Sequence, residues 1–375
     1  MSRHFDLAVV GAGIVGLAHA LAAAKKGKRV VVFDRDAQAN EASVRNFGFV
    51  TVTGQEAGQV WLRAMRSRDI WQDVTAKAGI PVIHQGLLVV ARSREAMDVI
   101  DAFAQTEMGE ACTVMDRDAV LADYPVVRAD GVHGGLWSPH ERRVEPREAI
   151  PAVAAWLEHS YGVTFLRNTS VRAVDVPSIE TGSGRFHAEA CVVCPGSDFS
   201  SLYAERIAAY GLTKCKLHML RLAAQPDSFR LPGSIMTDPS LVRYRGYSAL
   251  PEAAVLKAKI EAERPEIPDN GIHLIVVQGA DGSLTIGDSH HYAATPDPFV
   301  PAEVDDIIVR LANETLNIPE PRVVERWTGV YPSAADRLSL IDAPEDAVRI
   351  VMITSGTGMS TAFAIAEEVI ADLYG

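Results

Sequence analysis

The sequence has few cysteines, and their spacing excludes one class of protein at the outset. Its four cysteines, spread irregularly over 375 residues, are too few for the disulfide framework of a secreted domain. We therefore expect a cytoplasmic protein. Cys191 and Cys194 form a C-x-x-C pattern, but they lie in the apolar run AEACVVCPG with no second ligand pair nearby. This context favours a buried strand over a zinc or redox site, and we expect no metal centre.

The sequence also lacks a long basic run and a long uninterrupted hydrophobic run. Its 36 basic and 48 acidic side chains give a formal net charge of −12, which disfavours nucleic acids and anionic membranes as partners. The apolar stretch at residues 7–24 imitates a signal peptide, but His19 and three glycines interrupt it. No other segment is long and apolar enough to span a bilayer. The length, with 48% hydrophobic and 22% charged residues, predicts two globular domains.

The N-terminal segment predicts a nucleotide-binding turn. The apolar run Phe5–Val10 predicts a strand, and Gly11, Gly13 and Gly16 follow it as G-x-G-x-x-G where helical periodicity begins. Gly11 permits the tight turn, Gly13 lets the backbone approach a pyrophosphate, and Gly16 lets the helix pack on the sheet. The positive end of the helix dipole then attracts the phosphates.

The next segment completes this predicted βαβ unit. The helix is expected to run to about Lys26 and to end at Gly27, and the strand VVVF then leads to Asp34, eighteen residues after Gly16. A carboxylate at this place accepts hydrogen bonds from ribose hydroxyls and repels a ribose phosphate, so FAD or NAD is favoured over NADP. The glycines alone are also compatible with ordinary helix packing, but all four parts in register favour nucleotide binding.

A second glycine-led helix is predicted at the C-terminal end, in ITSGTGMSTAFAIAEEVIADL. Gly356 and Gly358 open it, and its apolar residues recur at helical spacing. The N–H groups and dipole at Gly358, Met359 and Ser360 suit the negative charge that a reduced flavin carries at its pyrimidine end. A nicotinamide dehydrogenase does not need this feature.

With these motifs, the sequence resembles the D-amino-acid oxidase, glycine oxidase and sarcosine oxidase family of flavoenzymes along its whole length. The segment EASVRNFGFV resembles the family's small and polar loop beside the pyrophosphate and flavin. The segment EPREAIPAVAAWLEHSYGVTFLRNTSV is similar to its Pro-led helix, Gly-Val strand and adenine-side residue. Further similar segments are VVCPGSDFS, LTIGDSH and RWTGVYPSAADRLSLI.

The resemblance implies an α/β fold with a discontinuous Rossmann-like FAD-binding domain formed by residues 1–80, 141–215 and 325–375. The second domain, residues 81–140 and 216–324, is expected to roof the flavin with a mainly antiparallel sheet plus helices. Strands are predicted in GLLVVA, HMLRLAA, GIHLIVVQGA and SLTIGD, and amphipathic helices in AMDVIDAFAQTEMGE and AEVDDIIVRLANETL. The charged segment PEAAVLKAKIEAERPEIPDNG predicts a surface helix and loop.

The motifs and the resemblance together imply a set of FAD-binding residues. They are Gly11, Ala12, Gly13, Ile14, Gly16, Asp34, Arg35, Ser43, Asn46, Phe47, Gly48, Val171, Cys194, Pro195, Gly196, Gly329, Arg337, Gly356, Thr357, Gly358, Met359, Ser360 and Thr361. Sarcosine oxidase relatives attach flavin through a late cysteine, whereas no cysteine follows Cys215 here. We therefore expect FAD to be bound non-covalently.

The substrate position departs from the family pattern. Where the amino-acid oxidases carry the Arg of W-x-G-x-R-P, this sequence has Tyr331, so a plain α-amino acid is a less secure substrate. We predict instead a small amine with a carboxylate or phosphonate, since Arg forks suit both anions. Strand-like alternation in LVRYRGYSAL would place Arg243 and Arg245 on one face. The candidate substrate residues are Arg45, Arg243, Arg245, Tyr247 and Tyr331.

No catalytic residue is identified from the sequence. His84, His218, His290 and His291 titrate near neutrality in water, but packing or surface roles are more typical for such histidines. Hydride transfer from a neutral amine to flavin requires orientation and not an obligatory protein base. Four interpretations stay open: an amine oxidase using dioxygen, a dehydrogenase passing electrons to a carrier, a flavoprotein with a non-catalytic binding role, and a nicotinamide dehydrogenase.

Overall fold

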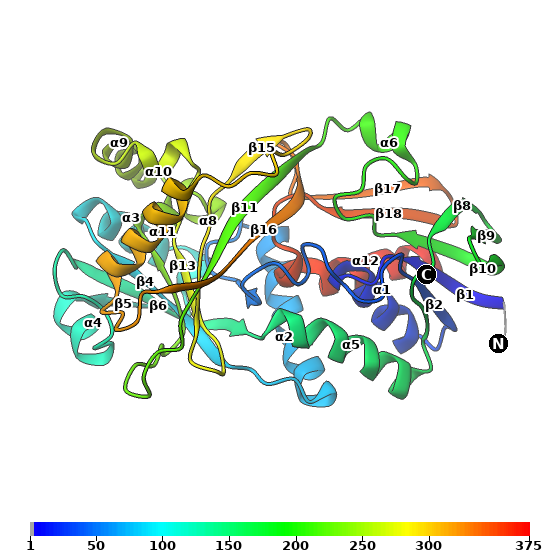
Figure 1. Cartoon of the computed structure of the whole chain (residues 1–375), viewed down its shortest axis with the longest axis horizontal. Coiled ribbons are helices and arrows are strands. Elements are labelled where there is room, and N and C mark those ends of the chain that lie inside the picture. The colour runs from blue at the N-terminus through cyan, green and yellow to red at the C-terminus, as the bar shows by residue number, and fades with distance from the viewer. Residues whose placement is uncertain (1–3) are drawn as a thin grey trace.

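The computed structural model describes residues 4–375, which form two sheets with helices packed on them (Figure 1). The two sheets lie side by side along the long axis of the molecule. Two long strands of the second sheet, β11 (Thr213–Leu222) and β16 (Val323–Ser333), extend toward the first sheet. This arrangement confirms the predicted α/β fold with a nucleotide-binding sheet and a second, mainly antiparallel sheet.

The first sheet has eight strands. They are β1 (His4–Val10), β2 (Val30–Phe33), β7 (Thr164–Leu166), β8 (Val171–Asp175), β9 (Ser178–Thr181), β10 (Gly184–Val193), β17 (Ser339–Glu345) and β18 (Val348–Ile353). The order is β17-β18-β10-β1-β2-β7, with β9 pairing to β10 and β8 to β9. The five central strands from β18 to β7 are parallel, as crossover connections through helices require.

Helices cover this sheet and bury its continuous apolar strands. They are α1 (Ile14–Lys25), α2 (Gln59–Ala78), α5 (Pro146–Tyr161), α6 (Ala204–Ala208) and α12 (Gly358–Tyr374). The hydrophobic core between β1, β2 and the helices contains Leu17 of α1, Trp71 of α2 and Phe363 of α12, with the last two rings packed edge to face at 5.1 Å. The first helix ends at Lys25 and Gly27 has φ +75°, which confirms the predicted stop.

The second sheet has ten strands. Besides β11 and β16 they are β3 (Phe49–Val50), β4 (His84–Ala91), β5 (Thr113–Asp116), β6 (Gly134–Arg143), β12 (Ser234–Thr237), β13 (Ile275–Gln278), β14 (Leu284–Gly287) and β15 (His291–Ala293). The order is β15-β11-β14-β13-β12-β4-β6-β3, with β16 beside β11 and β5 beside β6. All pairs are antiparallel except β4 with β12.

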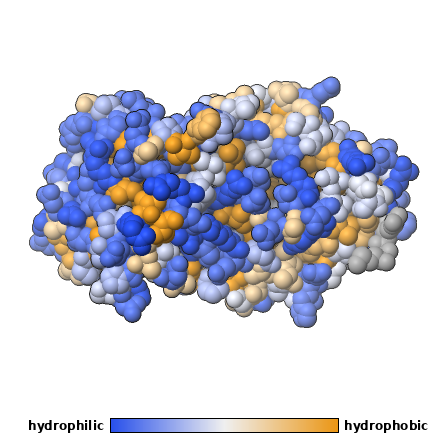
Figure 2. Space-filling model, in the orientation of Figure 1, coloured by the Kyte–Doolittle hydropathy of each residue, from blue (hydrophilic) through white to orange (hydrophobic). Residues whose placement is uncertain are grey.

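Shorter helices surround this second sheet. They are α3 (Arg94–Ala104), a 3-10 turn at Glu107–Gly109, α4 (Arg117–Asp123), α7 (Asp238–Leu241), α8 (Arg245–Ser248), α9 (Glu252–Glu263), α10 (Glu266–Asp269) and α11 (Ala302–Thr315). The two predicted amphipathic helices correspond to α3 and α11, and the predicted surface helix to α9 and α10. Among residues 4–375, every helix is too short or too polar to cross a lipid bilayer. Hydrophilic residues dominate the face seen in Figure 2, with hydrophobic ones in small separate groups.

The predicted strand alternation in LVRYRGYSAL is wrong. Arg243 lies in a turn after α7, and Arg245 begins the short helix α8. The backbone N–H of Tyr244 reaches the carbonyl of Ser240, and the N–H of Gly246 reaches the carbonyl of Gly54 at 2.9 Å. A Cβ on Gly246 would lie 2.3 Å from the carbonyl oxygen of Gln55. This close backbone approach, which sequence alternation cannot reveal, fixes a turn instead of a strand.

The predicted domain segments follow these two sheets except at their junctions. Residues 323–333 form β16 and pair with β11 throughout, so the start of the segment 325–375 contributes to the second sheet. The short strand β3 also pairs with β6 in that sheet. We keep the division into an FAD-binding and a substrate domain as a proposal, with chain crossings at β6, β11 and β16.

Candidate active site

The turn between β1 and α1 has the geometry that the three glycines predicted. Gly11 has φ +105°, and a Cβ on it would lie 2.5 Å from the carbonyl oxygen of Cys194. A Cβ on Gly16 would lie only 1.8 Å from the carbonyl oxygen of Gly11. Neither contact is possible for a real side chain, so this turn packs against β10 and against itself only with glycine.

The loop after Asp34 lies across the first turn of α1. The hydroxyl of Ser43 accepts the N–H of Ile14 at 2.9 Å, and a Cβ on Gly13 would lie 2.7 Å from that hydroxyl. Asn46 gives the loop its shape, because its amide nitrogen donates to the carbonyl of Ala42 and its amide oxygen accepts the N–H of Gly48, both at 2.7 Å. The loop therefore brings backbone and a hydroxyl to the positive end of the helix.

Asp34 is held at the end of β2 by two backbone groups. Its Oδ2 accepts the N–H of Ala12 at 2.7 Å and its Oδ1 accepts the N–H of Asp36 at 2.9 Å. Each carboxylate oxygen keeps a further lone pair for another donor. Asp34 lines a cavity of about 200 Å³ together with Arg35, Val171, Pro195 and Gly196.

A larger cavity of about 370 Å³ lies between the two sheets. Gly13, Ser43 and Cys194 line both cavities, so the two cavities are adjacent, one beside Asp34 and the other beside the start of α12. Residues 354–360, which form the turn into α12 and its first residues, line the larger cavity. The N–H of Ser360 donates to the carbonyl of Thr357 at 3.0 Å, whereas the N–H groups of Gly358 and Met359, at the very start of α12, precede the first acceptors of the helix and are available to a ligand. Of the predicted residues, Ile14, Gly16, Asn46, Phe47, Gly329, Gly356, Thr357, Gly358, Met359 and Ser360 line this larger cavity.

Arginine and tyrosine side chains lie at the second-sheet end of the larger cavity. The Nη2 of Arg243 donates to the hydroxyl of Tyr292 at 3.2 Å, and Arg243 takes part in no ion pair among residues 4–375. Arg245, in contrast, pairs with Glu56 at 3.0 Å. Tyr331 lies on β16 opposite Cys215, with its ring against Gly356. Burial raises the pKa of Tyr331 well above 10, so its hydroxyl remains a donor.

Arg45 also lines the larger cavity, at the edge near β16. Its Nη1 donates to the carbonyl of Thr328 at 3.5 Å, and its own carbonyl accepts the indole N–H of Trp327 at 3.2 Å. These contacts join the loop at residues 42–48 to the second sheet. The predicted substrate residues Arg45, Arg243, Arg245 and Tyr331 are thus brought to one cavity.

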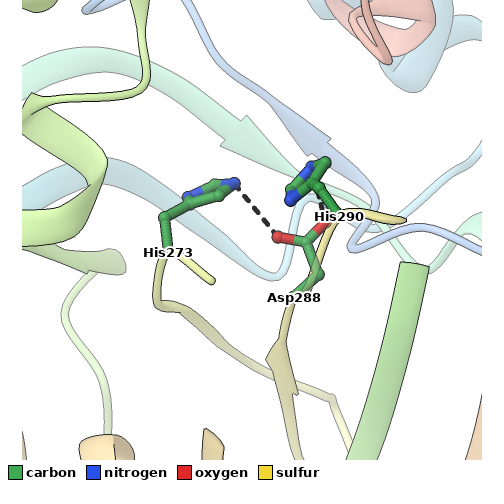
Figure 3. A group of neighbouring side chains, drawn as sticks. All are labelled: His273, Asp288 and His290. Atoms are coloured by element: carbon green, nitrogen blue, oxygen red, sulfur yellow. Dashed lines mark ion pairs between the residues drawn. The ribbon is translucent and has the colours of Figure 1, made fainter. Parts of the chain in front are cut away.

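Three buried side chains that the sequence interpretation did not group together meet in the same cavity (Figure 3). His273 Nε2 lies 3.0 Å from Asp288 Oδ1, and His290 Nε2 lies 3.8 Å from Asp288 Oδ2. Their exposed fractions are 3%, 5% and 7%. We call His273, Asp288 and His290 the triad. Among the described residues, these three form the group of His, Cys, Asp or Glu side chains whose polar atoms all lie within 4.8 Å of one another.

The triad results from the pairing of β13 with β14. Ile275 is opposite Gly287, and the backbones of His273 and Asp288 bond to each other at 3.0 and 3.2 Å just beyond these strands. His290 was one of four histidines considered from the sequence, but His273 and Asp288 were missed. Their only sequence signal is that each flanks an apolar strand, and the pairing of those strands is not visible in a single sequence.

Burial lowers the pKa of both triad histidines below 6.5 and outweighs the opposing effect of Asp288. Burial by itself would raise the pKa of Asp288, but His290, His273 and Arg243 more than offset it, so the carboxyl pKa is lowered. The triad is therefore an anion at neutral pH, formed by one carboxylate between two neutral imidazoles.

Some predicted site residues do not line either cavity. Tyr247 is fully buried, with its ring 4.5 Å from that of Phe103. Arg337 lies on the surface and pairs with Asp336 at 2.5 Å. Ala12, Gly48 and Thr361 lie behind the cavity wall. The histidines at 84, 218 and 291 are also outside both cavities.

The two sheets, the glycine-rich turn at the end of β1 and the two adjacent cavities are typical of a dinucleotide-binding protein with a ligand site between its sheets. The chain belongs to the family described as FAD dependent oxidoreductase, which matches residues 6–373. This confirms the family that the motifs resembled, and with it FAD as the cofactor. The residues fit FAD, because glycines leave room beside Asp34, the start of α1 and the start of α12, in two adjacent cavities that share lining residues.

Named relatives and solved structures are similar over much of the chain. A bifunctional ThiO/ThiG protein of Trichormus variabilis is 22% identical over 90% of this chain and 47% of its own length. Glycine oxidase of Geobacillus kaustophilus is 24% identical over 52% of this chain and 56% of its own length. The chain thus spans about half the length of the curated relatives it matches. The glycine oxidase structure from Geobacillus kaustophilus has a TM-score of 0.76 at 18% identity, covering 99% of this chain and 94% of that one.

Proposed function

We propose that the protein oxidises the C–N bond of a small amine that bears an anionic group, and that aminoalkylphosphonates are its favoured substrate class. Bound FAD supplies the hydride acceptor for the carbon beside the amine nitrogen, and the resulting imine reacts with water to give a carbonyl compound and a released amine. The main support for the proposal is that Arg243 lines the larger cavity and has no carboxylate within ion-pair distance among residues 4–375.

The side chains around Arg243 support an anion with three oxygens. The guanidinium, the hydroxyl of Tyr292 and the hydroxyl of Tyr331 line one end of the cavity. Each is a hydrogen-bond donor, and Arg243 provides a fork. A phosphonate has three oxygens for these donors, whereas a carboxylate has two. Tyr331, which replaces the family's arginine, therefore contributes a neutral donor in place of a second cation.

The role of Arg245 is expected to be smaller. Its Nη1 already donates to Glu56 at 3.0 Å, and its Nη2 donates to the carbonyl of Ala335 at 3.2 Å. A guanidinium paired with a carboxylate attracts a substrate anion less than one without such a partner, because the carboxylate offsets its charge. The two arginines therefore make a matched pair for mutagenesis.

Anaerobic flavin reduction tests the proposal. An aminoalkylphosphonate or its N-methyl derivative should bleach the flavin absorbance faster than glycine, sarcosine or D-alanine at equal concentration. Arg243→Ala should raise the apparent KM for the phosphonate by about 30-fold, as expected for about 2 kcal/mol from loss of a charged hydrogen-bond donor. Arg245→Ala is the comparison and should change KM much less. Faster reduction by the three amino acids would contradict the phosphonate assignment.

We propose dioxygen as the electron acceptor, with a carrier molecule as the alternative. The relatives from Geobacillus kaustophilus and from Bacillus sp. are named glycine oxidase and monomeric sarcosine oxidase, which supports dioxygen. Mixing the reduced protein with air-saturated buffer in a stopped-flow instrument distinguishes dioxygen from a carrier molecule as the electron acceptor. Return of flavin absorbance within one turnover time supports an oxidase, and reoxidation slower than turnover with an artificial acceptor supports a dehydrogenase.

A further inference from the structure

We propose that the triad of His273, Asp288 and His290 binds the ammonium group of the substrate and removes one proton from it, with His290 Nε2 as the proton acceptor. The inference rests on the proposed function, because it assumes an amine substrate. Removal of this proton is needed because an alkylammonium has no lone pair on nitrogen. Only the neutral amine can release a hydride from the adjacent carbon and form an imine. Most of a simple alkylamine is protonated at neutral pH.

The hydrogen bonds of His290 leave its Nε2 free to accept a proton. Its Nδ1 lies 2.8 Å from the carbonyl oxygen of Gly271, and a carbonyl can only accept, so Nδ1 carries the hydrogen. The lone pair of the neutral ring is therefore on Nε2. That atom lies 3.8 Å from Asp288 Oδ2, too far for a direct hydrogen bond. A substrate N–H group is what can bridge two such acceptors.

The second histidine holds the carboxylate. His273 Nε2 lies at an ion-pair distance of 3.0 Å from Asp288 Oδ1, and because an ionised carboxylate can only accept, we infer that this nitrogen carries the hydrogen. The hydroxyl of Ser240 donates to the carbonyl of Leu274 at 3.2 Å, and its oxygen lies 3.3 Å from His273 Nδ1. His273 Nε2 thus faces Oδ1 of the carboxylate and His290 Nε2 faces Oδ2 (Figure 3). His273 is a positioning residue in this arrangement.

The charges of the cavity are complementary to a zwitterion. The triad carries one negative charge and Arg243 one positive charge, and both line the larger cavity. A substrate with an ammonium and a phosphonate can place each end beside the opposite charge. The other titratable groups that face the triad are tyrosines and one cysteine from the neighbouring elements. They are Tyr244 before α8, Tyr292 on β15, Tyr331 on β16 and Cys215 on β11.

Burial keeps the imidazole of His290 neutral, and the Asp288 carboxylate, which opposes the effect of burial on the pKa of this ring, stabilises the imidazolium that forms. Burial lowers the pKa of His290 well below 6.5, so the ring is neutral across the neutral and alkaline range. In the step itself, an N–H bond of the ammonium breaks, a new N–H bond forms at His290 Nε2, and the electron pair stays on the substrate nitrogen. The triad changes from a charge of −1 to 0, since the new imidazolium lies beside the Asp288 carboxylate. No oxidant is consumed until the hydride is transferred.

The test compares the pH dependence of anaerobic flavin reduction in His290→Gln with that in His291→Gln. His291 is the adjacent histidine on β15, it does not line the cavity, and its ring contacts His218 at 5.3 Å. In His290→Gln, reduction at saturating substrate should be about 1,000-fold slower at pH 7, the factor set by the small fraction of free amine at that pH. It should rise tenfold per pH unit and approach the wild-type rate near pH 10, where solvent supplies the free amine. His291→Gln should follow the wild type at every pH.

A binding measurement that does not depend on turnover gives a second readout. The flavin absorbance shift reports binding of two unreactive phosphonates, a hydroxyalkylphosphonate without an amine and an aminoalkylphosphonate with no hydrogen on the carbon beside nitrogen. Asp288→Asn should weaken binding of the amine at least tenfold and leave the alcohol unchanged. This variant keeps the size of the side chain, so the proposal stays testable where His290→Gln loses FAD.

The outcomes separate this inference from the proposed function. If no amine reduces the wild-type flavin, both fail. If the wild type reacts and His290→Gln has the wild-type pH profile, only the triad proposal fails. Equal effects of Asp288→Asn on the two phosphonates would also contradict it. A divalent cation retained stoichiometrically by the purified protein, and lost in Asp288→Asn, would show instead that the triad binds metal.

Discussion

Replacing Asp34 tests two roles of this residue, its hydrogen bonds within the protein and its proposed hydrogen bonds to FAD. Its carboxylate accepts the N–H groups of Ala12 and Asp36 at 2.7 and 2.9 Å, and these bonds do not require FAD. Its remaining lone pairs face the smaller cavity, where we propose that they accept the ribose hydroxyls. Asp34→Ala therefore has two effects, one on the apoprotein and one on FAD affinity.

The two effects have different expected sizes. Loss of the acceptor for two backbone N–H groups at a half-buried site should lower the unfolding free energy of the apoprotein by about 1–3 kcal/mol. Loss of the ribose hydrogen bonds should separately weaken FAD binding by about 1–3 kcal/mol, which corresponds to about 5- to 150-fold in Kd. Only the second quantity tests the cofactor role of Asp34.

Fluorescence titration of the apoprotein with FAD measures the affinity, and urea unfolding of the apoprotein measures the stability. Asp98→Ala is the control, because Asp98 lies on α3, pairs with Arg94 at 3.2 Å and lines neither cavity. An FAD Kd unchanged in Asp34→Ala would refute the ribose role, even where the apoprotein is destabilised. A loss of stability with unchanged affinity would assign Asp34 to the turn alone.

Two further predictions concern the cofactor and the core. Acid or heat should release FAD from the intact chain without proteolysis, because no cysteine follows Cys215, which is fully buried in β11; flavin remaining on the denatured polypeptide would contradict this. Burial lowers the pKa of His19 in α1 from 6.5 to about 4, so the unfolded chain binds a proton in this range before the folded one does. Stability should therefore fall as pH falls from 6.5 to about 4, with His19 contributing about 2 to 3 kcal/mol of the loss between pH 7.5 and 4.5. Urea unfolding of His19→Leu at these two pH values should show a smaller loss than the wild type, and an equal loss would show that His19 does not cause it.

The parts of the site that depend on local sequence could be predicted. The glycines at 11, 13 and 16 follow an apolar strand, and a steric requirement for each is visible from spacing alone. Gly356 and Gly358 likewise open a helix whose buried face has helical periodicity. These short segments form the walls of the two cavities near α1 and α12, so most of the predicted cofactor residues line one cavity or the other.

The substrate end of the cavity depends on contacts between distant segments. Arg243 leaves the expected strand because Gly246 packs against Gly54, about two hundred residues earlier in the chain. Asp288 and His273 meet only because β13 and β14 pair in one particular register. Arg337 follows the family-like segment but turns outward to Asp336. For Arg243 and for the triad, the contacts that fix the position join segments far apart in sequence. For Arg337, the contact is an ion pair on the protein surface, which hydrophobic periodicity does not predict.

The most direct test of the proposed chemistry is an anaerobic titration that compares an aminoalkylphosphonate with the matching hydroxyalkylphosphonate, with product analysis. The amine should bleach the flavin and yield one equivalent of carbonyl compound and one of released amine per flavin reduced. The alcohol should bind without bleaching, since the triad takes a proton from an ammonium. Reduction by the alcohol and not by the amine would contradict C–N oxidation and assign the cavity to C–O oxidation.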